Sequence, residues 1–128
     1  MGTWDIEPWD NDIAADWFGD IFKKTKLAEY TRQTLQNCDP HYEFEEVRAA
    51  AFLVSVLGHV YVWPIEHRDQ DIALAVSKLE QVLTSPKLNE DGEDGKFNKM
   101  LREKIQEEIQ ELRSWTKKSK VEPLSNKG

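Results

Sequence analysis

The chain has 128 residues, a length that allows one ordinary domain and is too short for two independent hydrophobic cores. Its apolar content of 39% is modest, but five Trp, five Phe and three Tyr provide bulky groups that disordered chains lack, so the composition predicts a folded domain. The net charge of -7 argues against nucleic acid as a direct partner, because the phosphate backbone repels an acidic surface.

The charge is unevenly distributed along the chain. Residues 1–95 carry 19 acidic and 8 basic residues, a net charge of -11, whereas residues 96–128 carry 5 acidic and 9 basic residues, a net charge of +4. An acidic body of this kind favours a basic protein as its partner, since complementary potentials speed association and select between partners.

The sequence predicts neither export nor a membrane segment. The first 22 residues contain six acidic residues and no Lys or Arg, which a secretory leader would need. The longest apolar run, Ala49 to Val54, is far too short to span a bilayer. Cys38 is the only cysteine, so no internal disulfide can form. We therefore expect a cytoplasmic protein.

The first nine residues show no helical period and include Gly2 and Pro8. They predict a short extended arm that packs on the domain. Large aromatic side chains usually stabilise a small domain before they serve any other purpose. We therefore expect Trp4, Trp9 and Trp17 to lie in the core rather than to face a ligand.

Apolar residues at helical spacing predict a first helix directly after the arm. Asp10 or Asp12 is expected to cap its N-terminus, because an Asp side chain accepts a hydrogen bond from a free backbone N–H. Lysines at its C-terminal end suit the helix dipole. The predicted apolar face consists of Ile13, Ala14, Trp17, Phe18, Ile21 and Phe22.

Two further helices are predicted before residue 58. The second spans about Thr25 to Cys38, because Asp39 and Pro40 end one helix and begin the next. The residues of its inward stripe are Leu27, Tyr30, Leu35 and Cys38. The third spans about Pro40 to Leu57 and is apolar nearly all round, which predicts a central, buried helix.

Two amphipathic helices are predicted after a loop over residues 59–63. The fourth spans about Asp69 to Thr84, with the stripe Ile72, Ala75, Val76, Leu79, Val82 and Leu83. The fifth spans about Lys96 to Lys118, with the stripe Phe97, Leu101, Ile105, Ile109, Leu112 and Trp115. A Lys104–Glu108 pair is expected on its exposed side.

The predicted architecture is all-α. Residues 1–118 are expected to form a single domain, a bundle of about five helices with the short extended arm at its N-terminus. Residues 119–128 are rich in Lys and Ser and predict a flexible C-terminal tail.

Asp12, Asp16 and Asp20 recur every four residues along the first helix and form an acidic ridge. Like charges at this spacing cost about 0.2–0.5 kcal/mol per pair, so the ridge is mildly unfavourable by itself. Three interpretations of the ridge are open. It is an ordinary solvated face, it forms ion pairs with the basic fifth helix, or it binds another protein. The basic residues that such pairing would use are Lys99, Arg102 and Lys104.

Weaker signals point to a metal site or to catalysis. Cys38 and His41 have the spacing of a zinc half-site, which His59 and His67 would have to complete. Glu66 and His67 suit an acid–base pair. The residues available to a metal-dependent or acid–base enzyme are Asp10, Asp12, Asp16, Glu66 and His67. No phosphate-binding glycine loop, nucleophile elbow or metal-binding His pair on a helix occurs, so we predict no enzyme, no cofactor and no metal.

The opening Met1-Gly-Thr-Trp-Asp-Ile-Glu-Pro-Trp-Asp-Asn-Asp-Ile-Ala-Ala-Asp-Trp17 resembles the bacterial domain of unknown function numbered 4259. Its members typically open with a Gly-x-Trp-Gly-x-Gly-x-Phe-Asp-Asn-Asp pattern, followed by Ala and Asp-Trp. The run from Ala49 to Gly58 is similar to that family's central alanine-rich helix. This chain has Asp5 and Glu7 where the family has glycines, and Trp9 where it has Phe. The resemblance implies a bacterial, mostly helical protein and supplies no catalytic residues.

These observations predict a non-catalytic acidic domain that binds a protein, most concretely a bacterial immunity protein or inhibitor that neutralises a basic toxin or effector. The analogy with immunity proteins is one of size and charge. The residues predicted to bind the partner are Asp5, Glu7, Asp10, Asp12, Asp16 and Asp20. Two alternatives stay open: an enzyme that uses the N-terminal carboxylates, and a homo-oligomer in which the fifth helix forms the interface.

Overall fold

The computed structural model describes residues 8–9, 11–90 and 92–124, with side chains described through Thr116. These residues form five α-helices and one short 3-10 helix, and none of them lies in a strand. The elements are α1 (Asp12–Thr25), α2 (Leu27–Asn37), α3 (Phe44–Leu57), α4 (Arg68–Val82), η1 (Pro86–Asn89) and α5 (Gly95–Leu124). The prediction of a single all-α domain with about five helices is confirmed. The predicted N-terminal arm lies mostly outside the described residues.

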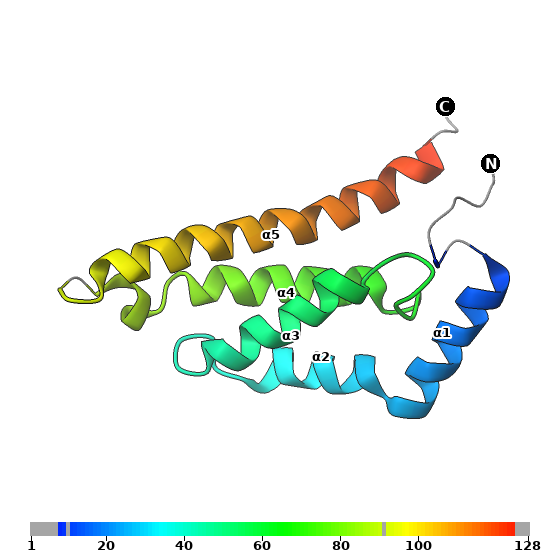
Figure 1. Ribbon diagram of the computed structural model, residues 1–128, viewed down its shortest axis with the longest axis horizontal. Coiled ribbons are helices and arrows are strands. Elements are labelled where there is room, and N and C mark those ends of the chain that lie inside the picture. Colours follow the sequence, from blue (N-terminus) through cyan, green and yellow to red (C-terminus); the bar gives the residue numbers. More distant parts are fainter. Residues whose placement is uncertain (1–7, 10, 91, 125–128) are drawn as a thin grey trace.

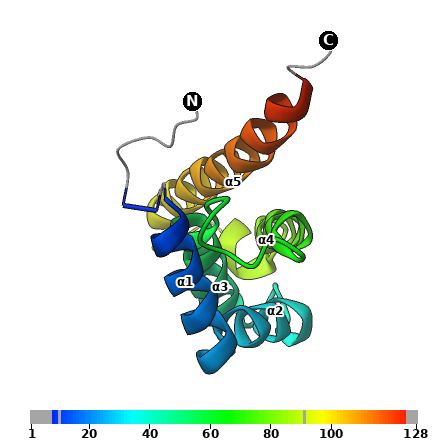
Figure 2. The ribbon, with the colours of Figure 1, turned by 90° about the vertical axis from the view of Figure 1, so that its right-hand side faces the viewer.

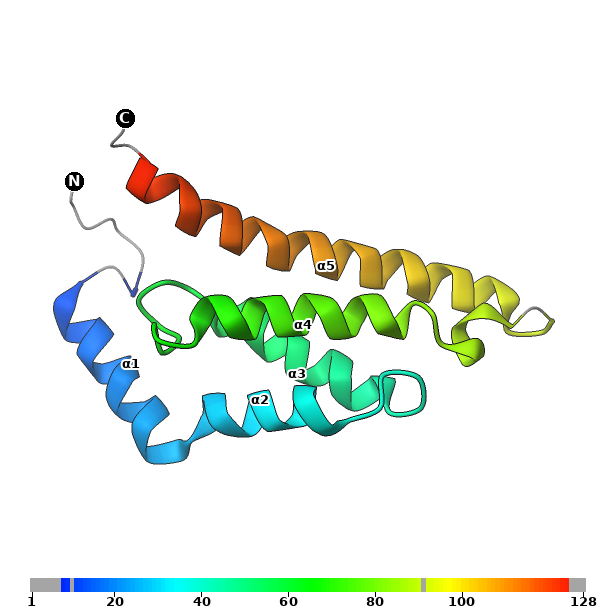
Figure 3. The same cartoon turned by 180° about the vertical axis from the view of Figure 1, so that it is seen from behind.

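Helices α3 and α4 form the middle of the bundle, with α2 along one side and α5 along the other (Figure 1). The view from behind shows the same order (Figure 3). Helix α1 lies across one end of the bundle, where it packs against α2 (Figure 1). Seen along the bundle, α1 and α4 stand on opposite sides (Figure 2). Helix α1 has α2 as its main helical neighbour and is a peripheral element, whereas α4 contacts α2, α3 and α5.

The core is built from the apolar stripes of the central helices. On α4 the residues Ile72, Ala75, Leu79 and Val82 are fully buried, as their helical spacing predicted. Facing residues from the other elements complete the same cluster: Leu35, Val47, Ala50, Ala51, Val54, Leu88, Ile105, Ile109 and Leu112. The sequence therefore identified the buried face of α4 and most of that of α5.

Arg68, in the first turn of α4, is a buried charged residue that the sequence did not reveal. Its side chain is 1% exposed. Its Nε donates to the carbonyl of Gly58 at 2.6 Å, and its Nη2 donates to the carbonyl of Trp115 at 3.2 Å. Burial lowers the pKa of the guanidinium, although Asp69 opposes this shift. The side chain thus joins the start of α4 to the end of α3 and to α5.

Helix α3 begins at Phe44, four residues later than predicted from Pro40. The intervening residues form a turn around Asp39 instead. The Asp39 carboxylate accepts from the backbone N–H of His41 at 2.8 Å, and the Asp39 N–H donates to Glu43 Oε1 at 2.7 Å. An Asp side chain that satisfies nearby backbone groups in this way competes with helix formation.

Helix α3 is also less buried than its composition predicted. Val47, Ala50, Ala51 and Val54 are buried, but Phe52 on the opposite side is 64% exposed. The prediction of burial nearly all round the helix was wrong, because the helices that contact α3 leave one of its sides uncovered.

Two apolar residues assigned to inward stripes face outward. Tyr30 on α2 is 70% exposed, because it lies on the side of that helix away from the buried Ala28, Thr31 and Leu35. The rest of the predicted stripe does face the core, where Leu35 is buried and Leu27 and Cys38 are partly buried. Phe97, in the first turn of α5, is 62% exposed. Helix α5 itself continues to Leu124, past the predicted end at Lys118.

Candidate protein-binding surface

Helix α1 begins and ends at residues with distinct backbone roles. Asn11 caps the helix, since its side-chain oxygen accepts from the N–H of Ala14 at 2.8 Å. The prediction that Asp10 or Asp12 is the cap was therefore wrong by one residue. Asn11 makes the hydrogen bond that was expected of the Asp side chain. At the other end Lys26 adopts the left-handed conformation with φ 56°, and this residue separates α1 from α2.

Among the described parts of the chain, contacts cover only one side of α1. Phe22 is 6% exposed, and its ring meets Trp63 edge-on with the ring centroids 5.2 Å apart. Phe18 is partly buried against the same core. Successive residues of a helix are rotated by about 100°, so Asp20 lies roughly opposite Phe22 and points outward. The acidic ridge is accordingly exposed along its whole length.

Two large apolar side chains lie beside the acidic ridge. Ile13 is 83% exposed, and Trp17, one turn further along, is 60% exposed. The expectation that Trp17 lies in the core was wrong, because none of the residues that the structure describes covers that side of α1. Trp9 does pack against the core, where its ring stacks on His59 with centroids 4.1 Å apart. Trp4 lies outside the described residues.

We use the name α1 face for the outward surface formed by Asp12, Ile13, Asp16, Trp17 and Asp20. The ridge carboxylates lie along one edge of this face and Trp17 along the other, about 100° apart on the helix. The remaining predicted partner-binding residues, Asp5, Glu7 and Asp10, lie outside the described residues. Sequence reasoning placed the ridge on the surface but assigned Ile13 and Trp17 to the core.

The charges of the α1 face are only weakly compensated. Asp20 pairs with Lys24 at 3.1 Å, and both side chains are largely exposed, so the pair contributes little. Asp12 and Asp16 have no ion pair with any described residue. The ridge therefore keeps most of its negative potential toward solvent.

Two of the three basic residues proposed as internal partners of the ridge are engaged elsewhere, and the third, Lys99, is exposed on the same helix. Arg102 donates to the carbonyl of Leu88, and Lys104 pairs with Glu107 at 3.5 Å. They belong to the start of α5, which lies at the end of the bundle away from α1 (Figures 1 and 3). Within the described residues, the structure does not bring the ridge to these groups.

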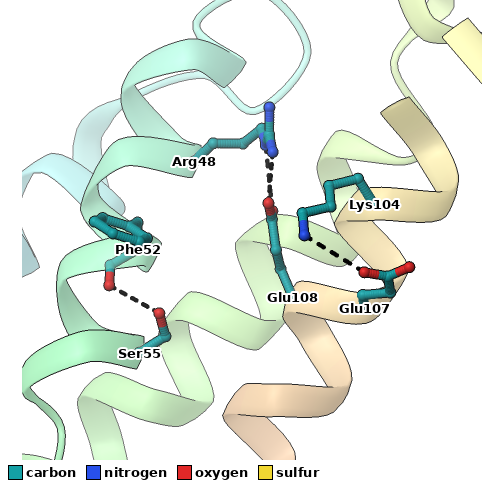
Figure 4. A network of polar contacts seen from close by, with 6 residues as sticks. All are labelled: Arg48, Phe52, Ser55, Lys104, Glu107 and Glu108. Carbon is teal, nitrogen blue, oxygen red and sulfur yellow. Dashed lines mark hydrogen bonds and ion pairs between the residues drawn. The ribbon is translucent and has the colours of Figure 1, made fainter. Parts of the chain in front are cut away.

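The expected Lys104–Glu108 pair does not form. Glu108 instead accepts two hydrogen bonds from the Arg48 guanidinium of α3, with N–O distances of 3.2 and 2.5 Å (Figure 4). A forked guanidinium binds a carboxylate more favourably than a lysine ammonium does, and α3 brings Arg48 directly opposite Glu108. Ser55, on the same side of α3, donates to the backbone carbonyl of Phe52 at 2.8 Å (Figure 4).

The residues proposed for a zinc site lie apart. His41 contacts Thr84 Oγ1 through its Nε2 at 2.8 Å, whereas His59 lies between Trp9 and Trp115 beyond the other end of α3. Burial, followed by the charges of Glu43 and Glu46, raises the pKa of the Cys38 thiol and so disfavours the thiolate that zinc binds. Among the described residues, no three His, Cys, Asp or Glu side chains are grouped to hold a metal ion.

No protein-family model, curated protein or solved structure matches the chain. The resemblance of residues 1–17 to the domain of unknown function numbered 4259 thus stays a prediction. Among the described helices, none is both long and apolar enough to cross a bilayer.

Proposed function

We propose that this chain is a non-catalytic protein-binding domain that docks its α1 face on a basic partner. The observation that carries the proposal is the exposure of Trp17 and Ile13 directly beside the acidic ridge. Tryptophan is enriched among the few residues that dominate binding energy, and such residues sit in desolvated pockets surrounded by polar groups. The α1 face combines an apolar anchor with a charged edge in this way.

The ridge supplies selectivity and speed rather than most of the affinity. Complementary charge raises the association rate and penalises acidic competitors. The net charge of -11 over residues 1–95 extends the same preference to the whole body of the domain. The concrete form of the proposal is a bacterial immunity protein or inhibitor that neutralises a basic toxin or effector, and it rests on an analogy of size and charge.

The partner is sought with a photo-crosslinking amino acid placed at position 17 of the full chain, in extracts of the producing organism. The matched control carries the same group at position 30, since Tyr30 is 70% exposed on α2 and lies outside the α1 face. We expect one basic protein to be linked at position 17 and not at position 30. Equal labelling at both positions, or none at position 17, would contradict the proposal.

Binding to the purified partner then tests the apolar edge and the acidic edge of the α1 face separately. Trp17→Ala is expected to weaken binding by about 2 kcal/mol or more, roughly thirtyfold, mainly through faster dissociation. The triple change Asp12→Asn, Asp16→Asn and Asp20→Asn is expected to slow association and to flatten its dependence on salt. Its stability in urea should stay within about 0.5 kcal/mol of wild type, because relief of self-repulsion offsets the lost Asp20–Lys24 pair. Unchanged, salt-insensitive kinetics would contradict the role of the ridge.

A further inference from the structure

A cleft of about 850 Å³ lies between α1, α2 and the loop that joins α3 to α4. No local sequence pattern predicts this cleft, because its walls come from three separate segments. Ala15 and Gly19 line it from α1, Arg32 lines it from α2, and Trp63 and Ile65 line it from the loop. On α1, Gly19 is about 60° from Asp16 around the helix axis, so the cleft borders the acidic edge of the α1 face.

Two lining residues of the cleft, Arg32 and Trp63, belong to a buried polar network. The Asp71 carboxylate, in a residue that is 1% exposed, accepts from Arg32 Nε at 2.7 Å and from Arg32 Nη2 at 2.8 Å. It also accepts from Trp63 Nε1 at 2.8 Å. The hydrogen bonds to Asp71 raise the pKa of Arg32, so the guanidinium stays protonated. Trp63 and Arg32 are thus fixed in place before any ligand binds.

The α1 wall of the cleft has open space at Gly19, which carries no side chain. A Cβ placed on Gly19 would meet no atom within 4 Å. Glycine inside a helix costs about 0.5–1 kcal/mol relative to alanine, and here it leaves room for an incoming side chain. Phe22, Trp63 and Ile65 give the cleft an apolar lining that suits an apolar occupant.

The charge at the cleft favours a cation beside that apolar group. Glu29 on α2 and Glu66 on the loop are exposed at its rim. Of the two basic lining residues, Arg32 is already neutralised by Asp71, which leaves Lys23 against two carboxylates. An acidic ligand would therefore meet a net negative rim, whereas Lys or Arg side chains would be attracted to it.

We propose that this cleft receives an apolar side chain of the basic partner, flanked in the partner's sequence by Lys or Arg residues that pair with Glu29 and Glu66. This inference rests on the proposed function and adds a second contact next to the α1 face. The apolar side chain occupies the space above Phe22 and Trp63, and the flanking cations lie at the rim. Specificity then requires both an apolar anchor and its basic neighbours.

The test uses three synthetic peptides as probes: acetyl-Lys-Lys-Leu-Lys-Lys-amide, the same peptide with Gly in place of Leu, and the same peptide with Glu in place of every Lys. Binding to the full chain is followed by the indole N–H signal of Trp63, assigned with a Trp63→Phe variant. The Leu peptide with lysines is expected to shift this signal saturably and to bind about tenfold more tightly than either of the others. Equal binding of the Leu and Gly peptides would overturn the proposal.

Two variants show whether the peptide occupies the cleft. Gly19→Phe fills the α1 wall and is expected to weaken the Leu peptide about tenfold or more, whereas the matched control Gly19→Ala leaves binding unchanged and adds helix propensity. The double change Glu29→Gln and Glu66→Gln leaves the walls intact and is expected to weaken binding several-fold and flatten its salt dependence. This double variant decides the matter if Gly19→Phe does not fold. If Gly19→Phe and the double Gln variant both bind the Leu peptide as wild type does, the peptide binds elsewhere and the proposal is overturned.

The same variants separate this inference from the proposed function. If the triple Asn variant or Trp17→Ala loses the partner while Gly19→Phe binds partner and peptide as wild type does, the α1 face is an interface and the cleft is not part of it. If Gly19→Phe loses both ligands while variants of the α1 face bind the partner normally, the cleft inference stands and the assignment of the α1 face fails.

Discussion

Helices α1 and α4 have similar sequence patterns and opposite environments. Both carry apolar residues at helical spacing, yet Ile72 on α4 is fully buried whereas Ile13 on α1 is 83% exposed. Helix α4 packs against α2, α3 and α5, and α1 crosses the end of the bundle with α2 as its main helical neighbour. An apolar stripe thus shows which face of a helix avoids water, and the arrangement of the other helices decides whether that face is covered.

The polar residues of the two helices differ in the same way. The first turn of α4 holds Arg68 and Asp71, both about 1% exposed and hydrogen-bonded to α2, the end of α3, the loop before α4, and α5. The acidic residues of α1 lie at the surface, where the one described ion pair of the ridge is Asp20 with Lys24. Helix α4 therefore stabilises the fold, whereas α1 has side chains available for a partner.

The largest effect is expected from Asp71→Ala, which leaves the Arg32 guanidinium and the Trp63 indole N–H without their shared acceptor. Breaking one side of a buried ion pair costs about 3–5 kcal/mol, and the free energy of unfolding in urea should fall by that amount. The control is Glu103→Ala on α5, whose carboxylate is exposed, and it is expected to change stability by less than about 1 kcal/mol. Similar losses for both variants would show that the buried network contributes no more than a surface charge.

A direct comparison of the two helices comes from the same substitution at two isoleucines. Ile72→Ala in α4 is expected to cost about 2–5 kcal/mol, because a fully buried side chain leaves a cavity. Ile13→Ala in α1 is expected to stay within about 0.5 kcal/mol of wild type. The midpoints of thermal unfolding provide the measurement. A loss at Ile13 that approaches the loss at Ile72 would mean that another part of the chain covers the α1 face.

The smallest effect concerns the junction between α1 and α2. Lys26 adopts a left-handed backbone conformation that costs a non-glycine residue about 1–2 kcal/mol. Lys26→Gly is therefore expected to raise the free energy of unfolding by roughly 0.5–1 kcal/mol and to slow amide exchange in α1. Lys24→Gly, two residues earlier and inside the helix, should lower stability by a similar amount. Destabilisation by Lys26→Gly would show that the junction is not strained.

The candidate site was predictable only in part. Asp12, Asp16 and Asp20 follow from their spacing, and the structure shows them exposed as a continuous ridge. Trp17 was predicted to lie in the core because large aromatic side chains usually stabilise a small domain, whereas the described residues leave its side of α1 uncovered. The cleft could not be predicted, because Gly19, Arg32 and Trp63 lie far apart in the sequence and meet only after α1 and α2 turn at Lys26. A lysine in the left-handed conformation gives no sequence signal of that turn, whereas a glycine would have suggested one.

The sequence by itself determined the helical class, the approximate positions of the helices, the buried face of α4 and most of that of α5, because these depend on residues within about four positions of one another. The tertiary structure decided which stripes are covered and which charges pair. Glu108 pairs with Arg48 and not with Lys104, because α3 places the forked guanidinium of Arg48 opposite that carboxylate. Asp71 is buried because α2 and the loop before α4 supply its donors. Which side chains pair and which are buried thus depends on where the chain reverses direction. A local sequence pattern does not predict the position of a helix that is distant in the sequence.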